Sequence, residues 1–285
     1  MNPLRKNLFT NFDRIDANKL QDLSDQIKDI QKKSNNKFVI YSALTSGYDK
    51  IFNQKINISN VDFIFISDED IENDFWNNVE ISLCYRDPRR TAKIFKILPH
   101  LFFSSYEASL WIDANLLLKA DVITLIKSFI KGGSVITMLE HDKRQCLYAE
   151  AKECIFWSRD KAHIISSQIE SYRENGYPNE NGLINARFIL RKHNIPQIKS
   201  LMNFWWSEID KNSSRDQISF NFVSWKMGVK YDLIDKNKRD DYIQIIEHKC
   251  DINYGSSSTI FLNLKYLIFK LGSFVKKINQ IKLKL

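Results

Sequence analysis

The stretch SLWIDANLLL, residues 109–118, places a carboxylate and an amide two residues apart at the end of an apolar run. On a β-strand, residues two apart point to the same face, so the oxygens of Asp113 and Asn115 would converge on one ion. Such oxygens suit Mg²⁺ or Mn²⁺, which keep water or phosphate ligands. The motif therefore predicts a divalent metal that neutralises a diphosphate. The alternative is that Asp113 caps a turn and Asn115 begins a loop.

Basic side chains precede this motif in RDPRRTAKIFK, residues 86–96. Arg90 and Lys93 are three residues apart in a predicted helix, so both would face one phosphate. A solvated basic helix face is the alternative.

The loop YSALTSGYDK, residues 41–50, contains groups suited to a nucleoside. Thr45 ends a predicted strand, and Gly47 permits a tight turn. Tyr48 can stack on a base, and Asp49 can accept a hydrogen bond from a ribose or a uracil N–H. An ordinary strand-to-helix turn would also use glycine and aspartate.

Ionisable groups gather again in two later segments. In EHDKRQCLYAE (140–150), His141 and Arg144 directly follow a predicted strand, where they would hold a sugar hydroxyl; a charged loop is the alternative. In SSRDQISF (213–220), Arg215, Asp216 and Gln217 stand at a predicted helix start, where an aspartate often serves only as a cap.

A late histidine, His248 in IIEHK, is a third candidate metal ligand. A lone histidine after apolar residues is more often structural.

The elements that must position these groups alternate between strand and helix. Strands are expected at 37–45, 61–68, 81–87, 109–115 and 134–139, and helices at 89–102 and 121–133. Residues 141–228 indicate helices and loops, with one long helix over 147–172 and others opened by Pro196 and closed by Gly228. Nearly continuous apolar strands between helices indicate an α/β sheet buried on both faces, which binds ligands at the carboxyl ends of its strands.

The expected domain organisation has three parts. Residues 1–36 form a helical N-terminal extension with Leu20, Leu23, Ile27 and Ile30 on one stripe, either docked on the domain or joining two subunits as a coiled coil. Residues 37–250 form the main domain. Residues 251–285 form a linker and a basic, amphipathic C-terminal helix, which either lies on an anionic membrane surface or packs on protein.

Composition excludes several classes of protein. The 285 residues are 44% hydrophobic and 27% charged, as in ordinary globular domains, and no run of 18 uncharged apolar residues occurs. The N-terminus has no apolar segment typical of a secretory signal. Much of the net charge of +8 comes from six lysines after Asp251, where no acid occurs, so nucleic acid is not an expected partner. Four cysteines without CxxC spacing favour a reducing compartment, namely the cytoplasm.

Taken in order, five segments resemble one family: FVIYSALTSGYDK, RRTAKIFKILPHLFFSSYEASLWIDANLLL, EHDKRQCLYAEA, GLINARFILRKHN and SSRDQISFNFVSWKMG. The succession is similar to the TOD1/MUCI70 glycosyltransferase-like domain (DUF616) and, more distantly, to GT-A enzymes of the glycosyltransferase 8 type. The resemblance covers roughly residues 37–250. It implies a GT-A fold, which is Rossmann-like with a mostly parallel central sheet flanked by helices.

The resemblance also implies roles for particular residues. Asp113 and Asn115 match the metal and diphosphate motif, whose second position here is Asn, and His248 matches a late metal ligand loosely. Thr45, Tyr48 and Asp49 match the nucleotide loop, while Arg90 and Lys93 match the basic helix. Asp216 and Gln217 match the segment beside the transferred sugar, where Asp216 would act as a base if configuration inverts and Gln217 would steady the sugar cation if it is retained. His141, Arg144 and Arg215 are candidates for binding the donor sugar or the acceptor.

The expected activity is transfer of a hexose, with a UDP-sugar favoured as donor, to a glycan or lipid-linked acceptor of a capsule, a lipopolysaccharide or a related surface polysaccharide. Mn²⁺ or Mg²⁺ is the expected cofactor, and the inner face of the cytoplasmic membrane is the expected location. A homo-oligomer is left open. A non-catalytic adaptor that binds sugar nucleotides or glycans is the main alternative, and a basic nucleic-acid-binding protein is the least favoured.

Overall fold

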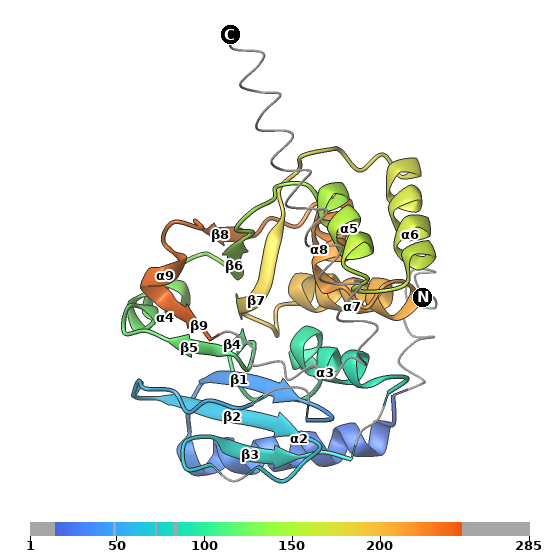
Figure 1. Cartoon of the computed structure of the whole chain (residues 1–285). Coiled ribbons are helices and arrows are strands. Elements are labelled where there is room, and N and C mark those ends of the chain that lie inside the picture. Colours follow the sequence, from blue (N-terminus) through green and yellow to red (C-terminus); the bar gives the residue numbers. More distant parts are fainter. Residues whose placement is uncertain (1–14, 48–49, 72, 83–84, 247–285) are drawn as a thin grey trace. The chain divides into compact units, whose positions relative to one another are not determined.

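The computed structural model describes residues 15–47, 50–71, 73–82 and 85–246 (Figure 1). Its strands are β1 (Phe38–Leu44), β2 (Val61–Ser67), β3 (Asn77–Glu80), β4 (Ala108–Ile112), β5 (Leu116–Leu118), β6 (Ile136–Glu140), β7 (Ile184–Arg191), β8 (Asp232–Ile234) and β9 (Ile243–Ile245). Its helices are α2 (Ala17–Ser34), α3 (Pro88–Ile97), η2 (Pro99–Leu101), α4 (Asp121–Lys131), α5 (Leu147–Phe156), α6 (Ala162–Glu174), α7 (Pro196–Lys211), α8 (Asp216–Met227) and α9 (Arg239–Tyr242).

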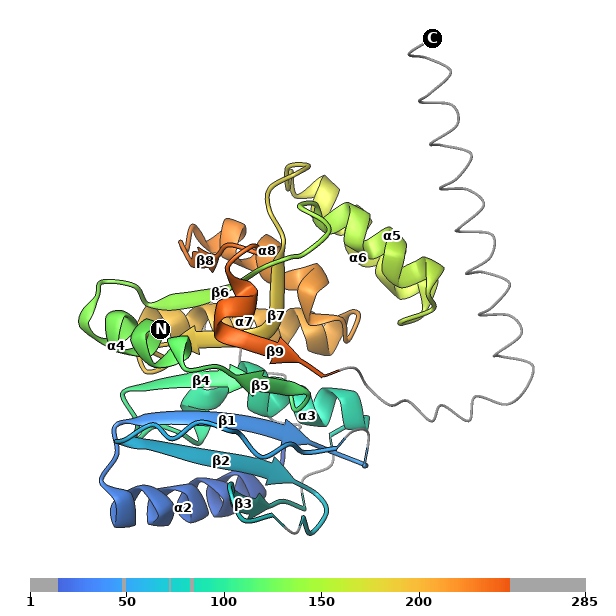
Figure 2. The same cartoon turned by 60° about the vertical axis from the view of Figure 1, so that its left-hand side comes forward.

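Seven strands form one twisted sheet in the order β3-β2-β1-β4-β7-β6-β8, and β5 pairs separately with β9 (Figure 2). Every neighbouring pair in the large sheet is parallel except the two pairs that involve β7. The chain builds outward from β1 to β3 and then returns to the other side of β1 with β4. This reversal makes the carboxyl ends of β1 and β4 the topological switch point, where ligands bind in sheets of this kind.

Apolar residues cover both faces of the large sheet. All seven positions of β1 are buried, because helices lie against one face while α4 and the β5–β9 pair lie against the other. β7 contributes to both faces: Ile189 belongs to the cluster with α3, α7 and α8, and Phe188 to the cluster with α4 and β5. The alternation is broken between Asn185 and Ile189, where the pairing with β6 shifts register. The predicted fold class, an α/β arrangement with a mostly parallel sheet flanked by helices, is confirmed.

Several predicted elements appear with small shifts. The strand expected over 37–45 is β1, and the helix expected over 121–133 is α4, which ends at Gly132. Pro196 opens α7. Gly228 closes α8 in the left-handed conformation, with φ of +63°, which favours glycine.

Three predicted elements are wrong. The third strand is β3 rather than 81–87, since the ladder with β2 ends at Glu80, opposite Ser67. The single helix expected over 147–172 is interrupted at 157–161 and becomes α5 and α6. The segment 141–228 also contains the long strand β7, which fills the place between β4 and β6.

The N-terminal stripe is buried, and α2 packs on the same face as α3. Leu23 and Ile27 lie in the core cluster of that face, with exposed fractions of 2% and 0%. Asp16 caps the helix by accepting from the backbone N–H groups of Asn18 and Lys19. The expected domain boundaries stay a prediction, and the expected C-terminal helix lies outside the described residues.

None of the helices in the described ranges is both long and apolar enough to cross a membrane.

Candidate functional site

The polar residues of SLWIDANLLL lie at the switch point, just beyond β4. Residues 113–115 form a turn between β4 and β5, closed by a hydrogen bond of 3.0 Å from the backbone N–H of Leu116 to the carbonyl of Asp113. The expectation that Asp113 and Asn115 share one face of a strand is therefore wrong, because the strand ends at Ile112. The turn nevertheless brings Asp113 back against helix α3.

Lys96 joins two carboxylates that are far apart in the sequence. Its ammonium lies 3.2 Å from Oδ1 of Asp113 and 2.8 Å from Oδ2 of Asp216, at the first position of α8. Lys93, one turn earlier on α3, lies 3.1 Å from the same Asp216 oxygen. The indole N–H of Trp111 donates to Asp113 at 2.8 Å, and the Lys96 ammonium lies 5.6 Å from the centre of that ring.

Burial makes these charges strongly interdependent. The side chains of Lys96 and Asp216 are only 7% and 6% exposed. Burial alone would raise the pKa of Asp216, but Lys93, Lys96 and Arg215 outweigh it and hold that pKa well below its usual range. Burial disfavours charged Lys96 as well, yet Asp113 and Asp216 raise its pKa. Asp216 is therefore ionised and is a weak general base, which argues against the base role expected for it.

The metal predicted for Asp113 and Asn115 does not fit the described residues. Oδ1 of Asp113 already accepts hydrogen bonds from the ammonium of Lys96 and the indole of Trp111. The amide of Asn115 donates to the carbonyl of Ile246 at 3.0 Å and so anchors the end of β9. Within residues 15–246, less their gaps, no three His, Cys, Asp or Glu side chains gather as a metal-binding group. The ammonium groups of Lys93 and Lys96 are the positive charges that the structure places beside Asp216, and Lys96 also lies beside Asp113.

Two residues expected to contact the nucleotide are engaged with backbone in this structure. Arg90 donates to the carbonyls of Ile209 and Asn212 at the end of α7, at 3.1 and 2.6 Å, and also pairs with Asp87. The hydroxyl of Thr45 donates to the carbonyl of Pro88 at 2.9 Å. Arg90 thus ties α3 to α7, and Thr45 ties the end of β1 to the start of α3. Their contact with a nucleotide stays a prediction.

His141 and Arg144 meet around a buried carboxylate, Glu150, on α5. Arg144 lies 2.6 Å from Glu150, and Nε2 of His141 lies 3.6 Å from the same oxygen. Nδ1 of His141 accepts from the backbone N–H groups of Lys143 and Arg144, so the neutral ring carries its proton on Nε2. Burial lowers the pKa of His141. This arrangement fixes the loop after β6, and His141 has no ring nitrogen free to act as a base.

The start of α8 brings the remaining candidates close to Lys96. The pKa of Arg215 is raised, because Asp216 and its other anionic neighbours outweigh burial. The amide of Gln217 donates to the carbonyl of Ile184 on β7 at 3.3 Å, and its side chain is half-buried. Asp216 and Gln217 therefore stand between α3 and the start of β7.

Tyr48, Asp49 and His248 lie outside the described residues. The backbones of Ile246 and Asn115 are hydrogen-bonded at 2.9 Å, so the described chain ends beside the 113–115 turn.

Sequence reasoning missed Lys96, Glu150 and Arg187. Lys96 follows Lys93 by three residues, the same spacing that singled out Arg90 and Lys93. Glu150 stands one helical turn before Cys154 on the buried side of α5. Arg187 lies on β7, whose polar residues interrupt the apolar pattern that marks a strand.

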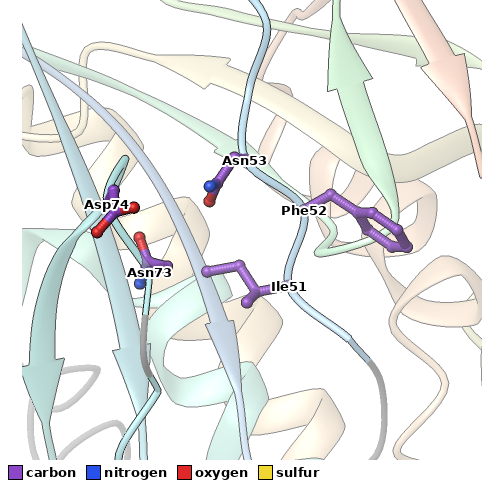
Figure 3. A pocket seen from close by; sticks show the side chains of 5 residues that line it. All are labelled: Ile51, Phe52, Asn53, Asn73 and Asp74. Carbon is purple, nitrogen blue, oxygen red and sulfur yellow. The ribbon is translucent and has the colours of Figure 1, made fainter.

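The loops after β1 and β2 line a surface pocket of about 430 Å³. Its residues are Ile51, Phe52, Asn53, Asn73 and Asp74, and Figure 3 shows Asn53, Asn73 and Asp74 grouped while the Phe52 ring points away from them. The pocket contains none of the charged residues around Lys96. It follows the Tyr48–Asp49 loop in the sequence by only a few residues.

The greater part of the chain matches a known protein family. The family model described as TOD1/MUCI70, glycosyltransferase-like domain, matches residues 66–248, which is more than half of the chain. The probable hexosyltransferase MUCI70 of Arabidopsis thaliana is 30% identical over 165 residues, covering 54% of this chain and 28% of that protein. Alkaline ceramidase TOD1 of Arabidopsis thaliana is 27% identical over 163 residues, covering 52% of this chain and 35% of that protein. The chain thus spans about a third of the length of these relatives.

Among solved structures, mouse xyloside xylosyltransferase 1 in its apo form aligns with a TM-score of 0.38 and 12% identity, over 70% of this chain and 85% of that one.

Proposed function

The chain belongs to the family of TOD1/MUCI70 glycosyltransferase-like domains, and from this premise we propose that it transfers a hexose from a nucleotide-sugar donor to a glycan. The observation that carries the proposal is the buried cluster of Lys93, Lys96, Asp113 and Asp216 at the switch point. Buried ionic groups of this density are costly to maintain and concentrate at functional sites.

The cluster is suited to stabilising a departing diphosphate. Negative charge develops on the phosphate oxygens as the bond to the sugar breaks, and preorganised cations in a buried site stabilise that charge strongly. In this proposal Lys93 and Lys96 meet the diphosphate. Asp216 orients both ammonium groups and accepts a hydrogen bond from a sugar hydroxyl. Gln217, at the edge of the same site, faces the transferred sugar.

The nucleoside would lie toward the loops after β1 and β2. The pocket lined by Asn53, Asn73 and Asp74 offers amide and carboxylate groups of the kind that bind base edges and ribose hydroxyls. A UDP-hexose is the donor we favour, with Tyr48 and Asp49 as the expected base and ribose contacts.

The acceptor we propose is a glycan or lipid-linked intermediate of a surface polysaccharide such as a capsule or lipopolysaccharide. The support for a lipid-linked acceptor is the basic, apolar-striped sequence after residue 258, which is suited to an anionic membrane surface. We accordingly place the enzyme at the inner face of the cytoplasmic membrane, with His141, Arg144 and Arg215 on the acceptor side. A second copy of the chain is a candidate partner.

Two other activities compete with this proposal. An adaptor with the same fold would bind a sugar nucleotide without turning it over. The similarity to a protein named alkaline ceramidase makes hydrolysis of a ceramide amide the other candidate.

The deciding experiment is a panel of nucleotide sugars assayed for release of nucleoside diphosphate and of the sugar, with EDTA, Mg²⁺ or Mn²⁺ present. Wild type is run beside Asp113→Ala and Asp216→Asn, with a ceramide substrate as a parallel arm. Turnover of one donor that both variants reduce would support the proposal, and the EDTA arm tests the expected metal. Donor binding without turnover would favour the adaptor, and fatty-acid release from ceramide alone would replace the proposal.

A further inference from the structure

Arg187 lies directly across the sheet from Asp113. The backbone N–H of Asp113 donates to the carbonyl of Arg187 at 2.9 Å, which continues the antiparallel ladder between β4 and β7 by one residue. Opposite residues in such a ladder point to the same face. Ile189, two residues along β7, packs in the cluster of α3 and α8. The pairing of β7 with β6 shifts register between Asn185 and Ile189, but burial and, to a lesser extent, the positive charge of Arg187 lower the pKa of His141, which lies beside Glu150 of α5, so the guanidinium is near the face that carries these helices.

The guanidinium of Arg187 has no ion pair and no hydrogen bond to any other residue of the described chain, although Arg187 is half-buried. Its neighbour Asp113 is engaged by Lys96 and Trp111 instead. An arginine in this position offers a planar, bidentate donor to an anion that enters the site.

The charges on this face of the sheet do not balance. Lys93, Lys96 and Arg187 face two carboxylates, Asp113 and Asp216, which leaves a formal positive excess. An unbalanced charge in a partly buried site is costly, and an anionic ligand removes the imbalance.

Arg215 does not add to this excess, because Glu150 as well as Asp216 raises its pKa against the effect of burial. Glu150 lies 2.6 Å from Arg144, which also lies 3.9 Å from Glu153, so one guanidinium is shared by two carboxylates on this side. A diphosphate carries enough negative charge to offset the one surplus cation.

We propose that Arg187, together with Lys93 and Lys96, binds the diphosphate of the donor directly, so that side chains supply the positive charge that the D-x-N motif would assign to a divalent metal. The inference rests on the proposed function and names how that site recognises its ligand. Asp113 then serves to orient Lys96 and is not a metal ligand.

The test measures binding of UDP and of inorganic pyrophosphate to the full chain by calorimetry, in EDTA and in Mn²⁺. We expect binding in EDTA to be within about threefold of binding in Mn²⁺. Arg187→Gln should weaken it about tenfold or more, since it loses a charge-assisted bidentate contact. Arg187→Lys keeps the positive charge but loses the planar, bidentate geometry, so its affinity should lie between those of wild type and Arg187→Gln. Arg173→Gln, on the exposed side of α6, is the matched control and should leave binding unchanged.

Asp113→Asn separates the two models of the site. If Asp113 orients Lys96, removing its negative charge leaves diphosphate binding in EDTA unchanged or stronger, whereas a metal ligand would be lost and binding with it. Binding that needs Mn²⁺ and disappears in Asp113→Asn would overturn the inference, as would full affinity in Arg187→Gln or no diphosphate binding under either condition. Donor turnover is scored separately, so a metal-dependent transferase would retain the proposed function while this inference fails.

Discussion

Replacing Lys96 with methionine tests whether the buried cluster is held together as the structure indicates. The substitution keeps most of the apolar stem and removes the ammonium that lies 2.8 Å from Asp216 and 3.2 Å from Asp113. Removing one partner of a buried ion pair costs about 3–5 kcal/mol, because the other charge is left uncompensated. Here Lys93 remains 3.1 Å from Asp216, and Asp113 is 32% exposed. We therefore expect the lower end, a loss of about 3 kcal/mol in the free energy of unfolding.

Urea unfolding at neutral pH measures this loss, with Lys32→Met as the control. Lys32 pairs with Asp29 at 3.1 Å, but both side chains are about 70% exposed, so its loss should cost less than about 0.5 kcal/mol. A double-mutant cycle with Asp216→Asn should give a coupling of about 2 kcal/mol, since each single change removes the same contact. The reasoning is refuted if Lys96→Met costs no more than Lys32→Met, or if the two substitutions are additive.

Three further outcomes are expected away from this cluster. Asp62→Ala should cost about 2 kcal/mol in unfolding free energy, measured in urea, because the buried hydroxyl of Tyr106 loses its acceptor at 2.7 Å. Burial lowers the pKa of His100 to about 4 and of His193 to about 3, below the 6.5 of an ordinary histidine, so the unfolded chain binds more protons than the folded one as pH falls. The contribution of these two neutral histidines to the free energy of unfolding is complete well above pH 6.5 and is lost as the pH falls toward 4. The loss should be about 4 kcal/mol at pH 5, measured by urea unfolding at a series of pH values. Burial raises the pKa of Cys154 to about 11, so iodoacetamide at pH 8 should alkylate it about a hundredfold more slowly in the native chain than in urea.

The fold class followed from the sequence because its signal is local. Runs such as KFVIYSALT and VDFIFISD contain several consecutive apolar residues (FVIY and FIFI) in place of alternating ones, which is typical of a strand buried on both faces. Pro196 and Gly228 likewise mark helix ends through their own backbone preferences. These signals depend on neighbours in the chain and not on what packs against them.

The misplaced elements depended on partners distant in sequence. β7 contains Asn185, Arg187 and Arg191, and these polar residues hid a strand. Arg191 is fully buried because its guanidinium donates to the hydroxyl of Tyr41 and to the backbone carbonyl of Lys96. Residue types alone gave no indication of these partners.

In the candidate site too, local motifs could be predicted from the sequence, whereas contacts between distant segments could not. Asp113 and Asp216 were identified from their motifs, but their common partner Lys96 depends on how α3 docks between β4 and α8. A motif locates a carboxylate, while the register and the helix docking decide what neutralises it. The strand geometry first assigned to Asp113 and Asn115 is wrong because β4 ends at Ile112, three residues before the expected end at Asn115.

The arrangement around Asp216 also bears on how a ligand enters. Lys93 and Lys96 are already paired with Asp216, so an anion must compete with that carboxylate for them. Its binding energy must compensate for the part of the buried ion pair that is lost. Arg187 has no such competitor within the described chain and can engage the anion first at little electrostatic cost. Diphosphate affinity should therefore depend more steeply on Arg187 than on either lysine. The lysines, which both contact Asp216, bind the diphosphate as well and in addition stabilise the charge that develops as the sugar–phosphate bond breaks.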